Sequence, residues 1–290
     1  MRVVTMTAKP STTYQEQVEL MKNRGCIILD EAACISFLQR VNYYRLTAYF
    51  LPFRRSDQSY LEGITFEQIK GIYDFDQKMR AFLFPIIEEL EIFIRTHLTY
   101  YHSQEYGSLG YMEASAFNEK HRHEESKERL YKLIKDNSRL PFVRHHNNNY
   151  GGEFPLWVAM ELFSMGSLSR FYSDLLSKDA KKIASIFNTH PSCLRSWLQC
   201  LTNLRNRCAH YGRLYFAKFV SEPKIPSGEQ HASTRRLFTQ IFMLKLLYFD
   251  KEKWNQVYLT QLSTLIEEYS PYINLDHIGF PTDWKDQLKK

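Results

Sequence analysis

One long run of helical periodicity constrains this chain more than any other feature. It begins at Thr65, where a Thr65-x-x-Gln68 pattern is typical of an N-terminal capping box, and it extends to Gly107. Pro85 interrupts the run, so we expect either a kink or two helices that meet there. In its second half, Glu91 and Arg95 stand four residues apart and can pair on one helix face.

The composition points in the same direction. Only 11 of the 290 residues are glycine, below the usual share of about 7%. Hydrophobic residues make up 44% and charged residues 24%, which excludes wholesale disorder. Few glycines and many long side chains favour an all-α fold. We expect a flexible tail over 1–11, an N-terminal helical region over 12–62 and a helical domain over 63–290, with 12–290 as one continuous globular unit.

Charge and cysteine usage narrow the class of protein further. A net charge of +6 permits an anionic partner without requiring one. Five cysteines without paired spacing argue against a disulfide framework, and no CxxC or CxxH motif indicates a zinc site. The N-terminus lacks an apolar signal-peptide core, and the longest apolar run, 237–249, is too short to cross a bilayer. We therefore expect a soluble, cytoplasmic protein with no membrane partner and no cofactor.

Several shorter segments carry specific expectations. An aromatic block over 42–54 predicts a core hairpin of helices. The polar segment that follows from 119 predicts a charged helix to 136 and then a loop with His145 and His146. The His121-x-His123 pair lies in that polar region, where a solvated surface is more typical than a metal site. Further helices are expected over 228–251 and 254–269. Core positions are assigned to Trp157, Trp197, Cys193, Cys200 and Cys208.

The strongest functional candidate is a polar segment at the end of an apolar helix that Pro191 opens. Its residues are Arg205-Asn206-Arg207-Cys208-Ala209-His210, followed by Tyr211-Gly212-Arg213-Leu214. A cation, an amide and a titratable base within two turns are the groups that metal-free attack on a phosphodiester needs. Gly212 is expected to end the helix in a left-handed conformation, with His210 in the last turn near the negative end of the helix dipole.

Helix geometry limits what one chain can do with these residues. On an ideal helix Arg205 and His210 are about 140° apart, whereas Asn206 and His210 differ by about 40°. Two copies of the helix that meet across a two-fold axis could gather both sets into one cleft, so we expect a homodimer. The bare Arg-x(4–6)-His pattern is weak, because chance supplies roughly two matches in a chain of this kind. The RNxxAH form at the end of an apolar helix is what distinguishes this copy.

The motif resembles that of the HEPN superfamily, and more of the chain resembles the abortive-infection (AbiD/AbiF-type) proteins within it. The matching stretches are KNRGCIILDEAACISFLQRVNYYRLTAYFLPFR, YDFDQKMRAFLFPIIEELEIFIRTHL, FPLWVAMELFSMGSLSRFY and SWLQCLTNLRNRCAHYGRL. The resemblance implies a HEPN-type helical bundle with an N-terminal helical extension. It also implies dimerisation, phage defence, metal-independent RNase activity and, in some members, pairing with a small noncoding RNA.

The resemblance also implies roles for individual residues. Arg205 would stabilise the scissile phosphate, His210 would act as acid or base in attack by the 2′-hydroxyl, and Asn206 would orient His210 or hold the phosphate. Arg207 would be a supporting cation that binds RNA, and a buried ion pair with a core Glu is its open alternative. Apart from the resemblance, Tyr44 and Arg45 could stack on and grip RNA, because aromatic side chains with arginine suit splayed bases, and core packing is the open alternative for these two. Arg213 is a further expected RNA contact. Glu91 and Arg95 are expected to be a structural pair or to support the catalytic helix.

Two classes of function therefore stay open. The first is an endoribonuclease that destroys cellular or phage RNA when it is released from restraint. The second is a noncatalytic RNA-binding protein that forms a ribonucleoprotein with a cognate small RNA. A DNA-binding regulator ranks third, because no helix-turn-helix spacing with a basic recognition helix is present.

Overall fold

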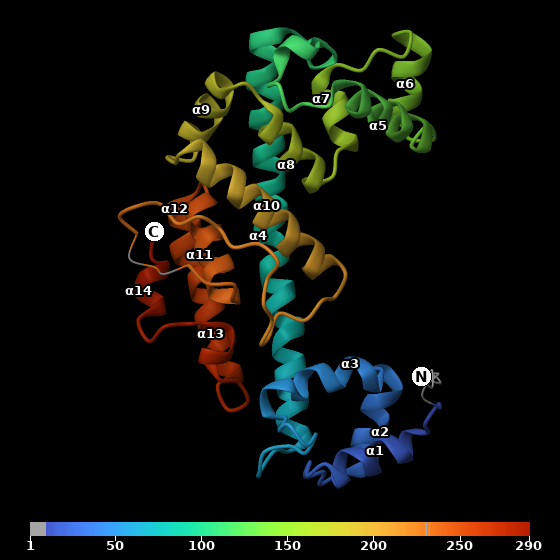
Figure 1. Ribbon diagram of the computed structural model, residues 1–290, viewed down its shortest axis with the longest axis vertical. Helices are drawn as coiled ribbons and strands as arrows, with labels where there is room; N and C mark the ends of the chain where they lie inside the picture. The colour runs from blue at the N-terminus through green and yellow to red at the C-terminus, as the bar shows by residue number, and fades with distance from the viewer. Residues whose placement is uncertain (1–9, 230, 232) are drawn as a thin grey trace, which may run out of the picture.

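The computed structural model describes residues 10–229, 231 and 233–290 (Figure 1). Most of the predicted tail at 1–11 therefore lies outside the described residues. Within the described part of the chain there are helices but no strands. Three isolated β-bridges occur, and they join Ile27 to Thr65, Arg54 to Tyr60 and Phe117 to Leu175. The predicted all-α class is confirmed.

A single helix, α4, runs through the length of the molecule in Figure 1 and spans Phe66–Tyr106. It begins where predicted, because the Thr65 side chain accepts a hydrogen bond from the backbone N–H of Gln68 at 3.0 Å. It ends at Gly107, whose φ of 78° is in the left-handed region. Of the two alternatives predicted at Pro85, that of two separate helices is wrong, because α4 continues through the proline. Helices α10, α11 and α13 all pack against α4, and we attribute its continuity through the proline to this packing.

The N-terminal region surrounds the lower end of α4 (Figure 1). Its elements are α1 (Tyr14–Asn23), α2 (Glu31–Arg40), α3 (Tyr43–Thr47) and the 3₁₀ helix η1 (Ala48–Phe53). The helix α3 continues directly into η1, so the aromatic block forms one helical segment instead of the predicted hairpin. Its core role is confirmed, since Leu46, Tyr49 and Phe50 are buried.

The middle of the chain covers the upper part of α4 (Figure 1). Its elements are η2 (Gly110–Met112), η3 (Ala114–Ala116), α5 (His123–Asp136), α6 (Pro141–Asn149), α7 (Leu156–Ala159), η4 (Met160–Leu162), α8 (Met165–Asp174) and α9 (Ser177–Ile186). The expected loop with His145 and His146 is in fact α6, because Pro141 occupies the first helical turn, where its missing N–H costs nothing. Trp157, predicted to be in the core, is 52% exposed.

The helix that carries the motif, α10 (Pro191–Ala209), packs against α4, α8, α9 and α11. Pro191 opens it as predicted. Its apolar face is buried, including Trp197, Cys193, Cys200 and Cys208, which confirms the predicted thiol seam. This packing fixes the helix so that its C-terminal end presents the polar motif.

The C-terminal elements lie beside the central helix in Figure 1. They are α11 (Leu237–Leu247), α12 (Lys251–Lys253), the π-helix η5 (Trp254–Tyr258), α13 (Leu259–Tyr269), η6 (Leu275–Ile278) and α14 (Trp284–Leu288). The predicted helix start at 228 is wrong by nine residues, because the segment before Leu237 contains Pro223, Pro226 and Gly228, which favour turns. None of the helices in the described residues is both long and apolar enough to span a membrane.

Candidate active site

The polar motif lies at the C-terminal end of α10. Asn206 and His210 are exposed there, and the Arg205 side chain is 37% exposed. His210 is the C-cap residue directly after Ala209, and within the described residues its imidazole has no hydrogen-bond or ion-pair partner. Arg205 donates a hydrogen bond to the Asn206 side-chain oxygen at 3.4 Å. The structure thus presents a cation, an amide and an imidazole to solvent, with no direct contact between Arg205 and His210.

A Schellman-type turn ends the helix. The Gly212 N–H donates to the Arg207 carbonyl at 2.7 Å, and the Tyr211 N–H donates to the Cys208 carbonyl at 3.1 Å. The left-handed residue is Tyr211, with φ of 56°, and not Gly212 as predicted. Gly212 is required for a different reason, since a Cβ atom there would lie 2.8 Å from the Arg207 Cγ atom. The close approach of these two residues makes the turn tight directly after His210.

Arg205 is oriented from α4. The Glu91 carboxylate lies 3.8 Å from the Arg205 Nε atom and 3.1 Å from a guanidinium nitrogen of Arg95. Arg95 in turn donates to the main-chain carbonyls of Met160 and Phe163. The predicted Glu91–Arg95 pair is therefore confirmed, and Glu91 also contacts the motif. Because Arg95 is anchored by two carbonyls, Glu91 has a fixed place from which to hold Arg205.

A residue that sequence reasoning missed, Asp76, fixes the loop after the motif. It is 0% exposed, and its carboxylate accepts hydrogen bonds from the backbone N–H groups of Leu214 and Tyr215 at 2.9 and 2.6 Å. The Tyr49 hydroxyl donates to it at 2.8 Å, and Arg80 forms an ion pair with it. Burial raises the pKa of Asp76, and the Arg80 guanidinium opposes that rise.

The sequence does contain one signal for this network. Asp76 and Arg80 stand four residues apart on α4, on a face that also carries Ile72, Met79 and Leu83, all of them buried. A carboxylate and a guanidinium at this spacing can pair, and a pair on an apolar face must be satisfied internally. The loop that supplies the remaining donors is far away in sequence, so its part in the network was not predictable.

Two of the residues predicted to bind RNA make main-chain contacts within the protein. Arg207 donates to the Arg213 carbonyl at 3.0 Å, and its guanidinium lies 4.6 Å from the ring centre of Phe219. Arg213 donates to the Ala48 carbonyl in η1. Burial lowers the pKa of both guanidinium groups. These contacts join the loop after α10 to the end of α10 and to the N-terminal region.

The other two predicted RNA contacts lie on α3. Tyr44 is 85% exposed, so its ring is available to a ligand. Arg45 donates to the main-chain carbonyl of Tyr211 and lies 5.9 Å from the ring centre of Tyr73. Arg45 therefore connects the N-terminal region to the turn that follows His210.

A groove of about 740 Å³ runs beside this turn. Its lining residues include Arg40 and Arg45, together with Arg80, whose guanidinium is paired with Asp76. The groove reaches Cys208, Ala209 and Tyr211 at the end of α10. None of the described residues that line it is acidic. Arg40 was not predicted from the sequence. A basic groove with aromatic side chains at its edge suits a nucleic-acid backbone.

Both histidines of the His121-x-His123 pair have partners within the protein. His121 lies 2.9 Å from Asp174, and His123 contacts the Met112 carbonyl at 2.9 Å. Among the residues that the structure describes, no group of three or more metal-ligating side chains lies close enough to hold an ion.

The fold and the site together define an all-α protein with an exposed Arg-Asn-His helix end beside a basic groove. A family model described as Abi-like protein matches residues 36–216, from within α2 to the loop after α10, and the chain belongs to this family. Membership supports a general role in abortive infection, a defence against phage. No curated protein and no solved structure gives a significant match.

Proposed function

We propose that this Abi-like protein is a HEPN-type, metal-independent endoribonuclease that acts as a homodimer. The observation that carries the proposal is the exposed end of α10, where Arg205 is held by Glu91 while His210 is unpartnered among the described residues. An oriented cation and a free imidazole are what transesterification of RNA requires. Membership of the Abi-like family supports the proposal that this activity serves phage defence.

The proposed reaction proceeds through two proton transfers and uses no metal ion. One imidazole takes the proton from the 2′-hydroxyl as its oxygen attacks the adjacent phosphorus atom. Arg205 stabilises the charge that develops on the phosphorane oxygens. A second imidazole gives a proton to the departing 5′-oxygen, which leaves a 2′,3′-cyclic phosphate and a 5′-hydroxyl end. Since each chain supplies one His210, the dimer supplies both imidazoles, and Asn206 orients one of them or holds the phosphate.

The basic groove provides a path for the RNA strand toward this site. Arg40 and Arg45 would face phosphates, and Tyr44 on the neighbouring surface would stack against an unpaired base. Arg207 and Arg213 act in this proposal mainly by holding the loop in place, because their guanidinium groups contact main-chain carbonyls.

A cleavage assay in the presence of EDTA tests the proposal. The intact protein should cut an end-labelled single-stranded RNA and leave 2′,3′-cyclic phosphate ends. His210→Ala and Arg205→Ala should each lower the rate by about a hundredfold or more. His145→Ala, which changes an exposed histidine on α6, serves as the matched control and should leave the rate unchanged. Loss of activity on adding EDTA would contradict the metal-independent mechanism.

The second candidate function is RNA binding without cleavage, and the basic groove is the observation that favours it. Purification without nuclease treatment, followed by the ratio of absorbance at 260 and 280 nm and a gel of extracted nucleic acid, separates the two. A discrete small RNA bound to a protein that cuts nothing would favour the ribonucleoprotein. Protein free of nucleic acid that cuts RNA would favour the nuclease.

A further inference from the structure

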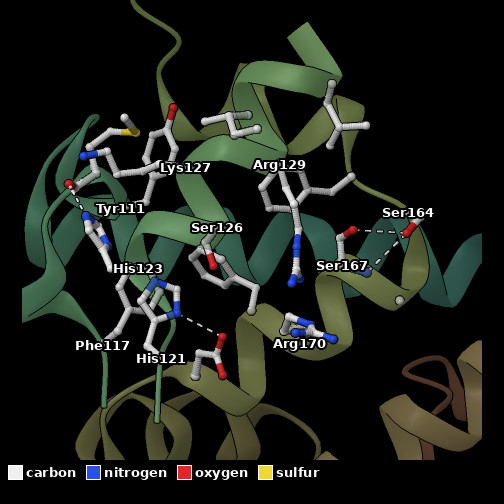
Figure 2. A pocket seen from close by; sticks show the side chains of 17 residues that line it. Tyr111, Phe117, His121, His123, Ser126, Lys127, Arg129, Ser164, Ser167 and Arg170 are labelled. Carbon is white, nitrogen blue, oxygen red and sulfur yellow. Dashed lines mark hydrogen bonds and ion pairs between the residues drawn. The ribbon is translucent and has the colours of Figure 1, made fainter. Parts of the chain in front are cut away.

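A second pocket lies between α5 and α8 (Figure 2). Its volume is about 350 Å³, which is within the range of small-molecule sites. The residues that line it come from 111–133 and 163–174, so it shares no residue with the motif or with the basic groove. None of the functions considered above uses it.

One wall of this pocket is aromatic and held in place. Tyr111, Phe117 and Phe171 line it, and all three side chains are buried. The Tyr111 hydroxyl donates to the Phe154 carbonyl at 2.6 Å. The Phe117 ring stacks on His121, with ring centres 4.1 Å apart. A fixed aromatic wall favours a flat, unsaturated ring as the ligand.

The mouth of the pocket is cationic. Figure 2 shows the guanidinium groups of Arg129 and Arg170 pointing toward one another from α5 and α8. Arg170 has no ion pair within the described residues, whereas Arg129 pairs with Glu125, an exposed residue of α5 outside the pocket lining. Asp174 is the one carboxylate among the described lining residues, and it is paired with His121. Both arginines are exposed. An anion between the two guanidinium groups would accept charge-assisted hydrogen bonds from both.

The edge of the pocket offers hydrogen-bonding groups for a polar ring. The Ser126 and Ser167 hydroxyls line it, and so does His123. The Nε2 atom of His123 must be the donor to the Met112 carbonyl at 2.9 Å, because a carbonyl oxygen only accepts. The Nδ1 atom of the neutral ring is then an acceptor, and it is buried without a partner among the described residues. An N–H group on the ligand would satisfy it.

We propose that this pocket binds a ribonucleoside monophosphate unit, with the phosphate between Arg129 and Arg170 and the base against the aromatic wall. The unit can come from a free nucleotide or from the phosphorylated end of an RNA strand, since both present the same chemistry. The proposal goes beyond the nuclease function and does not depend on it.

The pocket is connected to the candidate active site through a short series of contacts. Phe163 lines the pocket, and its main-chain carbonyl accepts a hydrogen bond from Arg95 at 3.0 Å. Arg95 pairs with Glu91, which contacts Arg205. Binding in the pocket is nevertheless measured separately from RNA cleavage, so that failure of one proposal does not affect the other.

Isothermal titration calorimetry of the full chain tests the site. The probes are AMP, GMP, CMP and UMP, with adenosine and inorganic phosphate as partial ligands. At least one nucleotide should bind at one site per chain, about tenfold or more tighter than either partial ligand. Arg170→Gln should weaken this binding by about tenfold. Arg144→Gln, which removes an exposed arginine on α6, is the matched control and should bind as the unchanged protein does.

A second variant and a second ligand keep the test decisive. Ser126→Phe fills the pocket without removing a charge and should also abolish nucleotide binding, while His210→Ala should bind normally. If the source is an RNA end, a short RNA with a 5′-phosphate should bind in an Arg170-dependent way, and the same RNA with a 5′-hydroxyl should not. Absence of binding by both free nucleotides and the phosphorylated RNA overturns the proposal. So does binding that both folded pocket variants leave intact.

Discussion

At the scale of single residues, one buried carboxylate decides how the candidate active site is held. Asp76 receives two backbone N–H donors from the loop after α10, together with Tyr49 and Arg80. The motif itself has few internal contacts, and the loop that follows it depends on this acceptor. Charge on Asp76 therefore supports the position of the turn next to His210.

We predict that Asp76→Asn strongly destabilises the protein. The amide places donor hydrogens against existing donors and leaves Arg80 buried without its counter-ion, so the free energy of unfolding should fall by about 3 to 5 kcal/mol. Denaturant unfolding followed by circular dichroism measures the change. Asp74→Asn, in the partly exposed pair with Lys70 one half-turn away, should cost less than about 1 kcal/mol. Equal losses in the two variants would argue against the role given to Asp76.

At the scale of elements, α4 is the helix against which the others are placed. It contacts α8, α9, α10, α11 and α13, and it supplies Glu91 as well as Asp76 to the region of the motif. Gly71 in α4 allows the side chain of Tyr272 to approach the helix closely. A Cβ atom on Gly71 would lie 2.3 Å from the Cγ atom of Tyr272, in the segment after α13.

The close contact between Gly71 and Tyr272 gives a prediction that carries its own control. Alanine usually favours a helix by about 1 kcal/mol over glycine, yet Gly71→Ala should lower the free energy of unfolding by about 1 to 3 kcal/mol because the methyl group displaces Tyr272. Removing the obstacle with Tyr272→Ala in the same chain should recover part of the loss. Thermal or denaturant unfolding of both single variants and the double variant gives the coupling energy. Strict additivity would show that the two residues do not interact.

At the scale of the whole molecule, one chain alone does not bring Arg205 and His210 together. The motif residues leave α10 in different directions, and Arg205 turns toward Glu91 on α4. A second copy of the chain, related by a two-fold axis, would bring another Arg205 and another His210 to the same cleft. The proposed reaction needs that second imidazole.

Mixing of unchanged and variant chains tests this arrangement. Co-expression of equal amounts of the unchanged chain and His210→Ala should lower the cleavage rate per total chain to about a quarter, because a dimer that contains one His210→Ala chain keeps only one of the two imidazoles. End-labelled RNA measures the rate, and co-expression of the unchanged chain with His145→Ala, which should leave the rate unchanged, is the control. Sedimentation at micromolar concentration that showed only monomer, with and without RNA, would contradict the dimer.

The sequence was sufficient for the elements whose causes are local. Low glycine content and helical periodicity predict an all-α fold, and the Thr65 cap and Gly107 mark the ends of α4. The same applies to the start of α10 at Pro191 and to its buried thiols. The polar end of that helix was recognisable because charged residues follow directly on an apolar periodic run.

Other features depended on contacts between segments far apart in the chain. Pro85 stands inside a continuous helix, and Trp157 lies on the surface although it is in an apolar stretch. Arg207 and Arg213 look like free cations in the sequence, but main-chain carbonyls hold both. The division into 12–62 and 63–290 stays a prediction.

Local patterns fix which residues form helices and which helix carries the Arg-Asn-His group, because capping, propensity and periodicity act over a few residues. The tertiary structure decides which charges remain available for chemistry. A guanidinium or carboxylate is neutralised, buried or left exposed according to the segments packed around it, and those segments join it from distant parts of the chain. Asp76 with Leu214 and Arg205 with Glu91 are therefore properties of the fold.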